Sequence, residues 1–131
     1  MRTREIWVID DDIIYKTIMK KIIQKSEIFH STLLFSNGKE AINALKGAIE
    51  NKVLPPDIIL LDIEMPVMDG WGFMAEFAKF NLEINSEIKI YISSSSIAVE
   101  DKMKAKNNPN ILGYMSKPIS LNDLKLIAAF D

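Results

Sequence analysis

The sequence predicts an α/β fold, a (βα)5 arrangement in which five strands form a doubly wound parallel sheet with helices on both faces. Two observations predict it. Short apolar runs alternate along the 131 residues with segments whose apolar residues recur at helical spacing. In addition, the run at residues 57–61 (DIILL) is continuously apolar after its first residue, which is typical of strands buried on both faces.

The first strand–helix unit opens the chain. Residues 6–9 (IWVI) predict a buried strand that ends at three consecutive aspartates. Residues 13–26 place Ile14, Ile18 and Ile22 four apart, with lysines between them. This spacing predicts an amphipathic helix with these isoleucines on its apolar face.

The remaining units follow the same alternation, with turn-forming residues between them. Polar residues at 36–38, the Pro55-Pro56 pair and the run at 107–110 separate the elements, and Ser120 can cap the last helix. We expect strands at residues 31–35, 57–61, 88–92 and 111–115, and helices at residues 39–50, 71–80, 97–106 and 121–129. No linker or repeat interrupts them, so residues 1–131 are predicted to form a single domain.

Composition excludes several classes of function. Lys and Arg total 16 and Asp and Glu total 18, so the net charge of −2 gives no hint of nucleic-acid binding. The lack of cysteine removes disulfides and thiol nucleophiles, and the single histidine, His30, excludes a multi-histidine metal site. No apolar run approaches the ~20 residues of a membrane span, and no signal peptide is recognised, so we expect a cytoplasmic protein.

Charged and hydroxyl side chains collect where four of the predicted strands end, which is where open parallel sheets bind ligands. They are Asp10, Asp11 and Asp12 after the first strand, Asp62 after the third, Ser93 and Ser94 after the fourth, and Lys117 near the end of the fifth. Clustered carboxylates repel one another without a cation, and hard oxygen ligands suit Mg²⁺. A lysine and a hydroxyl can stabilise a transferring phosphoryl group, and a carboxylate can accept it. These residues favour Mg²⁺-dependent phosphoryl chemistry at an aspartate.

Four motifs, in order along the chain, carry a family resemblance. They are Val8-Ile9-Asp10-Asp11-Asp12, the loop at residues 61–70 (LDIEMPVMDG), the four serines at 93–96, and Gly113-Tyr114-Met115-Ser116-Lys117-Pro118. Through them nearly the whole chain resembles a response-regulator receiver domain, the flavodoxin-like, CheY-like fold of two-component signalling. The resemblance implies a sheet with the strand order 2-1-3-4-5.

The resemblance also implies a role for each site residue. Asp62 would be the phosphoacceptor and a metal ligand. Asp11 would bind Mg²⁺ directly, Asp10 would act largely through water, and Glu64 would offer its backbone carbonyl to the metal. Lys117 would pair with the phosphoryl oxygens.

A hydroxyl at the end of the fourth strand would hydrogen-bond the phosphoryl group. It could be Ser93 or Ser94, and we prefer Ser94 because Lys89 then falls where the family usually begins this strand with proline. Tyr114, three residues before the lysine, matches the aromatic residue that changes rotamer on activation.

The implied function is a stand-alone receiver that catalyses only its own phosphorylation and dephosphorylation. A histidine kinase or phosphotransfer protein would be the phosphohistidine donor. Phosphorylation would switch a face made of the fourth helix, fifth strand and fifth helix toward a downstream protein. We expect a monomer or transient dimer that binds neither nucleic acid nor membrane. Glu64 and Ser96, which flank the site, are expected to tune the lifetime of the phosphate.

Two other functions stay open at this point. A phosphatase with an aspartyl-phosphate intermediate would use a short Asp-x-Asp motif, which Asp10 and Asp12 provide, but it leaves residues 65–70 without a role. A nucleotide-binding module would need a glycine-rich first loop. The chain could also be a domain excised from a longer protein, although Met1 favours a natural start.

Overall fold

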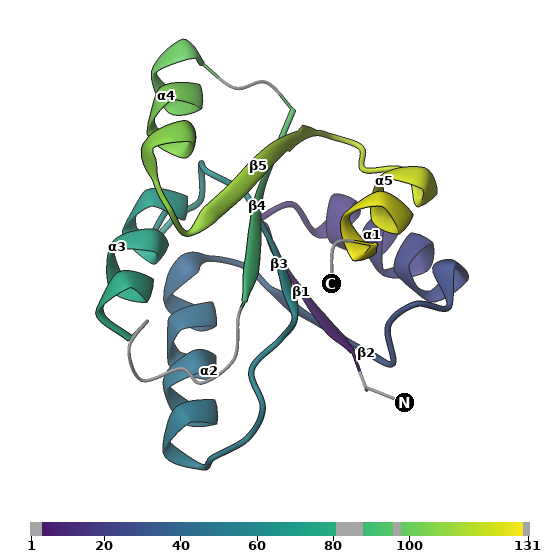
Figure 1. The fold of residues 1–131 in the computed structure, drawn as a ribbon, viewed down its shortest axis with the longest axis horizontal. Helices are drawn as coiled ribbons and strands as arrows, with labels where there is room; N and C mark the ends of the chain where they lie inside the picture. Colours follow the sequence, from purple (N-terminus) through teal and green to yellow (C-terminus); the bar gives the residue numbers. More distant parts are fainter. Residues whose placement is uncertain (1–3, 81–87, 96–97, 130–131) are drawn as a thin grey trace.

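Ten elements alternate from strand to helix in the computed structural model, which describes residues 4–80, 88–95 and 98–129 (Figure 1). They are β1 (Glu5–Ile9), α1 (Ile13–Ser26), β2 (Ser31–Phe35), α2 (Gly38–Glu50), β3 (Ile58–Leu61), α3 (Gly70–Phe80), β4 (Lys89–Ser94), α4 (Val99–Asn107), β5 (Ile111–Ser116) and α5 (Leu121–Ala128). The predicted order of strands and helices is confirmed.

The strands of the described residues form one parallel sheet in the order β2-β1-β3-β4-β5. The (βα)5 fold and the strand order implied by the resemblance are therefore both confirmed. The register places Ile9 of β1 beside Phe35 of β2 and Leu61 of β3. Because these strands run in the same direction and end at the same level, the residues that follow Ile9 and Leu61 meet at one end of the sheet.

Successive residues of each strand pack on opposite faces of the sheet. Trp7 and Ile9 join the core cluster that includes α2, α3 and α4, whereas Ile6 and Val8 join the cluster that includes α1 and α5 (Figure 1). All four side chains are at most 3% exposed. Burial on both faces explains why the strands are continuously apolar in sequence.

Some boundaries differ from the prediction by one or two residues. β4 continues to Ser94 and β5 to Ser116, because these two serines still pair with each other across the sheet. α4 begins at Val99, whereas residue 97, the predicted start, lies outside the described residues. The predicted cap of α5 is confirmed, since the Ser120 hydroxyl accepts a backbone N–H three residues on at 3.1 Å.

The apolar face of α1 differs from the predicted one. Ile14 is 70% exposed and Ile18 is 45% exposed. The buried stripe consists instead of Tyr15, Met19 and Ile23, which have the same spacing one residue further along. The predicted helix is confirmed, but the predicted face is wrong.

An N-cap in the loop before α1 sets where the helix begins. The Asp12 carboxylate accepts the backbone N–H groups of Ile14 at 2.9 Å and Tyr15 at 3.1 Å. This N-cap starts the helix directly after the short loop that follows β1. The first turn therefore starts close to the end of β1, and Tyr15 rather than Ile14 packs in the core against the sheet.

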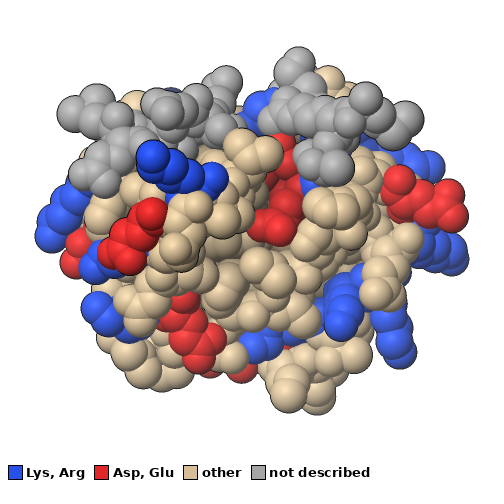
Figure 2. All heavy atoms as spheres, turned by 90° about the horizontal axis from the view of Figure 1, so that it is seen from below, with Lys and Arg blue, Asp and Glu red and all other residues tan. Residues whose placement is uncertain are grey.

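The surface carries charges of both signs. On the face drawn in Figure 2, basic (blue) and acidic (red) side chains are interspersed among other residues, and no extended area of one sign covers it. Within the described part of the chain, no helix combines the length and apolar character needed to cross a membrane.

The loop between β3 and α3 passes very close to the backbone at the end of β3. The N–H of Gly70 donates to the carbonyl of Ile63 at 2.8 Å. A Cβ atom at residue 70 would lie 2.5 Å from the carbonyl oxygen of Asp62. Glycine is required here because any side chain would displace the backbone of Asp62.

We predict that Gly70→Ala lowers the free energy of unfolding by about 1–3 kcal/mol, because the added methyl group collides with backbone. Gly47→Ala in α2 is the matched control, since a Cβ there meets nothing within 4 Å. That variant should gain about 0.5–1 kcal/mol from the higher helix propensity of alanine. Urea unfolding measures both values. Equal stabilities of the two variants would contradict the prediction.

Candidate functional site

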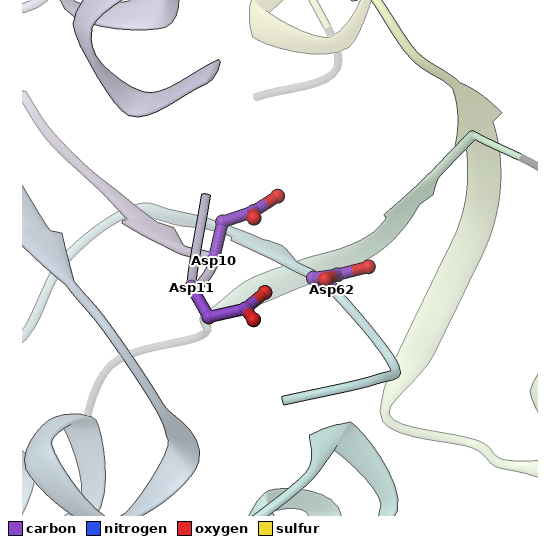
Figure 3. A group of neighbouring side chains, drawn as sticks. All are labelled: Asp10, Asp11 and Asp62. Carbon is purple, nitrogen blue, oxygen red and sulfur yellow. The ribbon is translucent and has the colours of Figure 1, made fainter. Parts of the chain in front are cut away.

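Three carboxylates meet at the carboxyl end of the sheet. Asp10 and Asp11 follow β1, and Asp62 follows β3 (Figure 3). One carboxylate oxygen from each residue lies within 4.8 Å of the others. Asp10 is 1% exposed and Asp62 is 8% exposed, whereas Asp11 is exposed at the mouth of the site. The structure thus brings together the three carboxylates that the sequence analysis assigned to one site.

Backbone hydrogen bonds continue from the sheet into these aspartates. The N–H of Asp62 donates to the carbonyl of Ile9 at 2.9 Å, and the N–H of Asp10 donates to that of Phe35 at 3.0 Å. The Asp10 carboxylate accepts the N–H of Asp12 at 2.9 Å. Asp12 itself caps α1, so the third aspartate of the triplet serves the helix rather than the cluster.

The ammonium group of Lys117 closes the cluster on one side. It forms an ion pair with Asp10, and its Nζ lies 3.6 Å from Oδ1 of Asp62. Its backbone N–H donates to the carbonyl of Ser94 at 2.9 Å, and the peptide bond to Pro118 is cis. Burial alone would lower the pKa of Lys117, but the hydrogen bond and charge of Asp10, together with the charges of Asp62 and Tyr15, hold that pKa above its ordinary value. The lysine therefore stays charged.

Negative charge exceeds positive charge around Asp62. Burial, followed by the charge of Asp10, raises the pKa of Asp62 from 3.8 to about 6, although Lys117 acts in the opposite direction. The carboxylates repel one another, and a cation between them would relieve that repulsion. Mg²⁺ takes oxygen ligands, uses one or two carboxylates and keeps several waters. The donor set of the cluster therefore fits the predicted metal.

The two serines at the end of β4 lie in different surroundings. Ser93 is 2% exposed, and its Oγ lies 2.9 Å from the hydroxyl of Tyr15. Ser94 is half-buried at the last position of β4, opposite Ser116 of β5. Because the Ser93 hydroxyl is engaged inside the protein, this arrangement favours Ser94 as the hydroxyl that meets a phosphoryl group, and its role stays a prediction. Ser96 lies outside the described residues.

Glu64 and Tyr114 both reach the surface. Glu64 is exposed in the loop between β3 and α3. Tyr114 of β5 is 48% exposed and lines a groove of about 440 Å³ between α4 and β5. Nζ of Lys102 lies 5.5 Å from the centroid of its ring. The metal contact of Glu64 and the rotamer change of Tyr114 stay predictions.

The sequence analysis missed one residue of the site, Tyr15. Its ring lies against Lys117, with 4.4 Å from Nζ to the ring centroid. A sequence signal for its burial was present, because Tyr15, Met19 and Ile23 repeat with the same period as the predicted stripe of Ile14, Ile18 and Ile22. Period alone does not decide which of two stripes is buried, so the sequence pattern could not select it.

The chain is similar to known proteins over nearly its whole length. It matches the family model of the response regulator receiver domain over residues 6–129. It is 33% identical over 112 residues to the sensor histidine kinase CheAY of Helicobacter pylori, covering 86% of this chain and 13% of that protein. It is 26% identical over 115 residues to the chemotaxis protein CheY of Halobacterium salinarum, covering 88% of this chain and 85% of that protein. A two-component response regulator from Cytophaga hutchinsonii superposes with a TM-score of 0.88 at 26% identity, over 98% of this chain and 96% of that one.

Mg²⁺ should stabilise the folded protein, because the three carboxylates come together only in the folded state. At tenfold excess over its dissociation constant, a ligand adds about 1.4 kcal/mol to the free energy of unfolding. We therefore expect the melting temperature of the wild type to rise with added Mg²⁺. Asp11→Asn should lose most of this rise, while Glu50→Gln, an exposed carboxylate at the end of α2, should keep it. If the melting temperature of Asp11→Asn rises with Mg²⁺ as much as that of the wild type, Mg²⁺ does not bind at this cluster.

Removing the charge of Asp62 should stabilise the metal-free protein. This carboxyl loses its proton near pH 3.8 when unfolded but near pH 6 when folded, so folding stability falls as pH rises between these values. Above pH 6, the free energy of unfolding of Asp62→Asn should exceed that of the wild type by about 1–2 kcal/mol, after allowance for solvent screening. The difference should vanish toward pH 4. Urea unfolding in EDTA measures it, and a gap independent of pH would rule out this cause.

Proposed function

The chain belongs to the response regulator receiver domain family of two-component signalling, and we propose that Asp62 accepts a phosphoryl group from a phosphohistidine donor in a Mg²⁺-dependent reaction. Phosphorylation then switches a protein-binding surface, so the protein acts as a phosphorelay switch that modifies only itself. One observation carries the proposal: Oδ1 of Asp62 lies 3.6 Å from Nζ of Lys117 within the carboxylate cluster.

In this proposal the Asp62 carboxylate is the nucleophile. One of its oxygens forms the new P–O bond as the P–N bond to the donor imidazole breaks, and the imidazole nitrogen keeps the electron pair. The carboxylate must be ionised to react, and with a pKa of about 6 most Asp62 side chains are ionised at neutral pH. The exposed position of Asp11 leaves the mouth of the site open to a donor.

Positive charge at the site offsets the negative charge of the transferring group. Lys117, paired with Asp10, lies where its ammonium can reach phosphoryl oxygens carried by Asp62. When bound, Mg²⁺ would supply further positive charge and would polarise the phosphoryl group. Asp10, Asp11 and Asp62 would hold the metal, with the backbone carbonyl of Glu64 as a further ligand.

Ser94 is the proposed link between the site and the surface. Its hydroxyl would donate to the phosphoryl group on Asp62. It ends β4, and Ile92, two residues earlier, pairs with Tyr114 of β5. A shift of Ser94 toward the phosphoryl group would therefore displace the end of β4. Through strand pairing it would also change the position of Tyr114 and the shape of the groove between α4 and β5.

Receiver domains exchange phosphate with histidine kinases and pass the signal to downstream targets. For this chain we propose a histidine kinase or phosphotransfer protein as donor, in the cytoplasm, and a downstream protein that binds the α4-β5-α5 face. The groove on that face combines apolar Val99 and Met103 with Lys102 and Lys106, a mixture suited to protein contacts. We further propose one receiver domain over residues 1–131, since both core clusters share one sheet. We also propose that it acts as a monomer or transient dimer.

The phosphatase alternative has less support. Its Asp-x-Asp pair would be Asp10 and Asp12, but the Asp12 carboxylate accepts two backbone N–H groups at the start of α1. That side chain is therefore committed to the helix and lies outside the carboxylate cluster. In the receiver proposal Asp12 caps α1, and the three clustered aspartates are available to the metal and the phosphoryl group.

We predict that acetyl phosphate with Mg²⁺ adds one phosphoryl group to the wild-type protein, measured by intact mass. Asp62→Asn should abolish the gain because it removes the nucleophile, and EDTA should abolish it because it removes the metal. Glu50→Gln is the control for loss of an exposed carboxylate and should behave as wild type. A phosphohistidine protein should serve as the second donor. If neither donor modifies the wild type, or if Asp62→Asn is modified equally, the proposal fails.

A further inference from the structure

Tyr15 connects three elements of the fold beside the proposed phosphoryl site. It lies on α1 and is 8% exposed. Its hydroxyl lies 2.9 Å from Oγ of Ser93 on β4. The face of its ring lies 4.4 Å from Nζ of Lys117, which follows β5. A single side chain thus contacts both the end of β4 and the lysine of the site.

Hydrogen bonds restrain Tyr15 at its backbone and at its hydroxyl. Its backbone N–H donates to the Asp12 cap at 3.1 Å, which fixes the first turn of α1. Its hydroxyl is tied to Ser93, whose own side chain is 2% exposed and belongs to the interior. With its backbone and its hydroxyl both fixed, the ring has little freedom to rotate away from Lys117.

A lysine in this position needs such support. Its four-carbon chain has many rotamers, and ordering it costs conformational entropy. Asp10 and Asp62 attract the ammonium, but both also belong to the proposed metal cluster. The aromatic face attracts the ammonium without a formal charge, and more strongly because the lysine side chain is only 15% exposed. This contact does not compete with a metal for carboxylate oxygens.

We propose that Tyr15 is a positioning residue, whose ring, braced by the hydrogen bond to Ser93, holds the Lys117 ammonium at the phosphoryl site. The inference rests on the proposed function, because it assigns Lys117 to the phosphoryl oxygens. Tyr15 lies outside the acidic cluster, and Ser93, which positions it, lies beside the proposed switch hydroxyl.

A buried tyrosine can also serve packing alone, and the variants are chosen to separate the two roles. Tyr15→Phe and Ser93→Ala each remove the brace but keep a ring, while Tyr15→Leu removes the ring. Tyr91 supplies the matched control: it is also 8% exposed, belongs to the same core cluster and lies two residues before Ser93 on β4. Thermal unfolding of each variant first establishes that it is folded.

The first measurement is the mobility of Lys117 in the metal-free protein, from ¹³C relaxation of its ε-methylene group. Tyr15→Leu should lower the order parameter clearly, and Tyr15→Phe and Ser93→Ala should lower it less. Tyr91→Leu and Tyr91→Phe should leave it at the wild-type value. An order parameter that stays unchanged in Tyr15→Leu, or that falls equally in Tyr91→Leu, overturns the inference. Since no phosphoryl donor is used, this result stands even if the proposed function fails.

The second measurement is the rate of phosphorylation by saturating acetyl phosphate and Mg²⁺. Tyr15→Leu should slow it about tenfold and Tyr15→Phe or Ser93→Ala about threefold, as expected for a desolvated cation–π contact and a neutral hydrogen bond. In a Lys117→Met background, Tyr15→Leu should add less than a twofold loss, because it acts through the missing ammonium. Full additivity of the two losses would overturn the inference. A wild-type rate in Lys117→Met would instead count against the proposed function.

Discussion

Three carboxylates stand within 4.8 Å of one another because the backbone of the sheet holds them there. The hydrogen-bond ladder does not stop at the last strand residue. It continues from Asp62 to Ile9 and from Asp10 to Phe35, so both aspartates are fixed by rigid, buried strands. Like charges held so firmly cannot separate to relieve their repulsion. Burial, followed by the charge of Asp10 held beside it, raises the pKa of Asp62, and the ammonium of Lys117 pairs with Asp10.

The surroundings of the cluster differ in burial between its two sides. On the α1 side, Tyr15 and Ser93 are buried and hydrogen-bonded to each other, and the ring of Tyr15 faces Lys117. Toward α4, Ser94 is only half-buried, and Tyr114 is 48% exposed beside a groove. Under the proposed function, the two sides would have different tasks. In that proposal the buried contacts on the α1 side would hold the charged groups in place, while a partner could reach the exposed Tyr114 on the other side.

Most of the acidic site could be predicted because its residues are marked locally. Asp10 and Asp62 each end an apolar run, and parallel strands place such ends at one edge of the sheet, where β1 and β3 are neighbours. Lys117 belongs to the motif near the end of the fifth run. The choice between Ser93 and Ser94 is different, because neighbouring residues of a strand point to opposite faces. Their burial, and the Tyr15 hydroxyl beside Ser93, appear only when α1 is placed.

The sequence by itself determined the alternation of strands and helices, the parallel sheet and the residues that end each strand, since these depend on local apolar patterns and turn residues. Only the tertiary structure decided which side of α1 is buried. Ile14 and Tyr15 begin stripes of equal period, and the second is the one that packs in the core against the sheet. That rotation of α1 places an aromatic ring against Lys117 and leaves Ile14 exposed. The contact joins residues about 100 positions apart, and local patterns carry no information about such pairs.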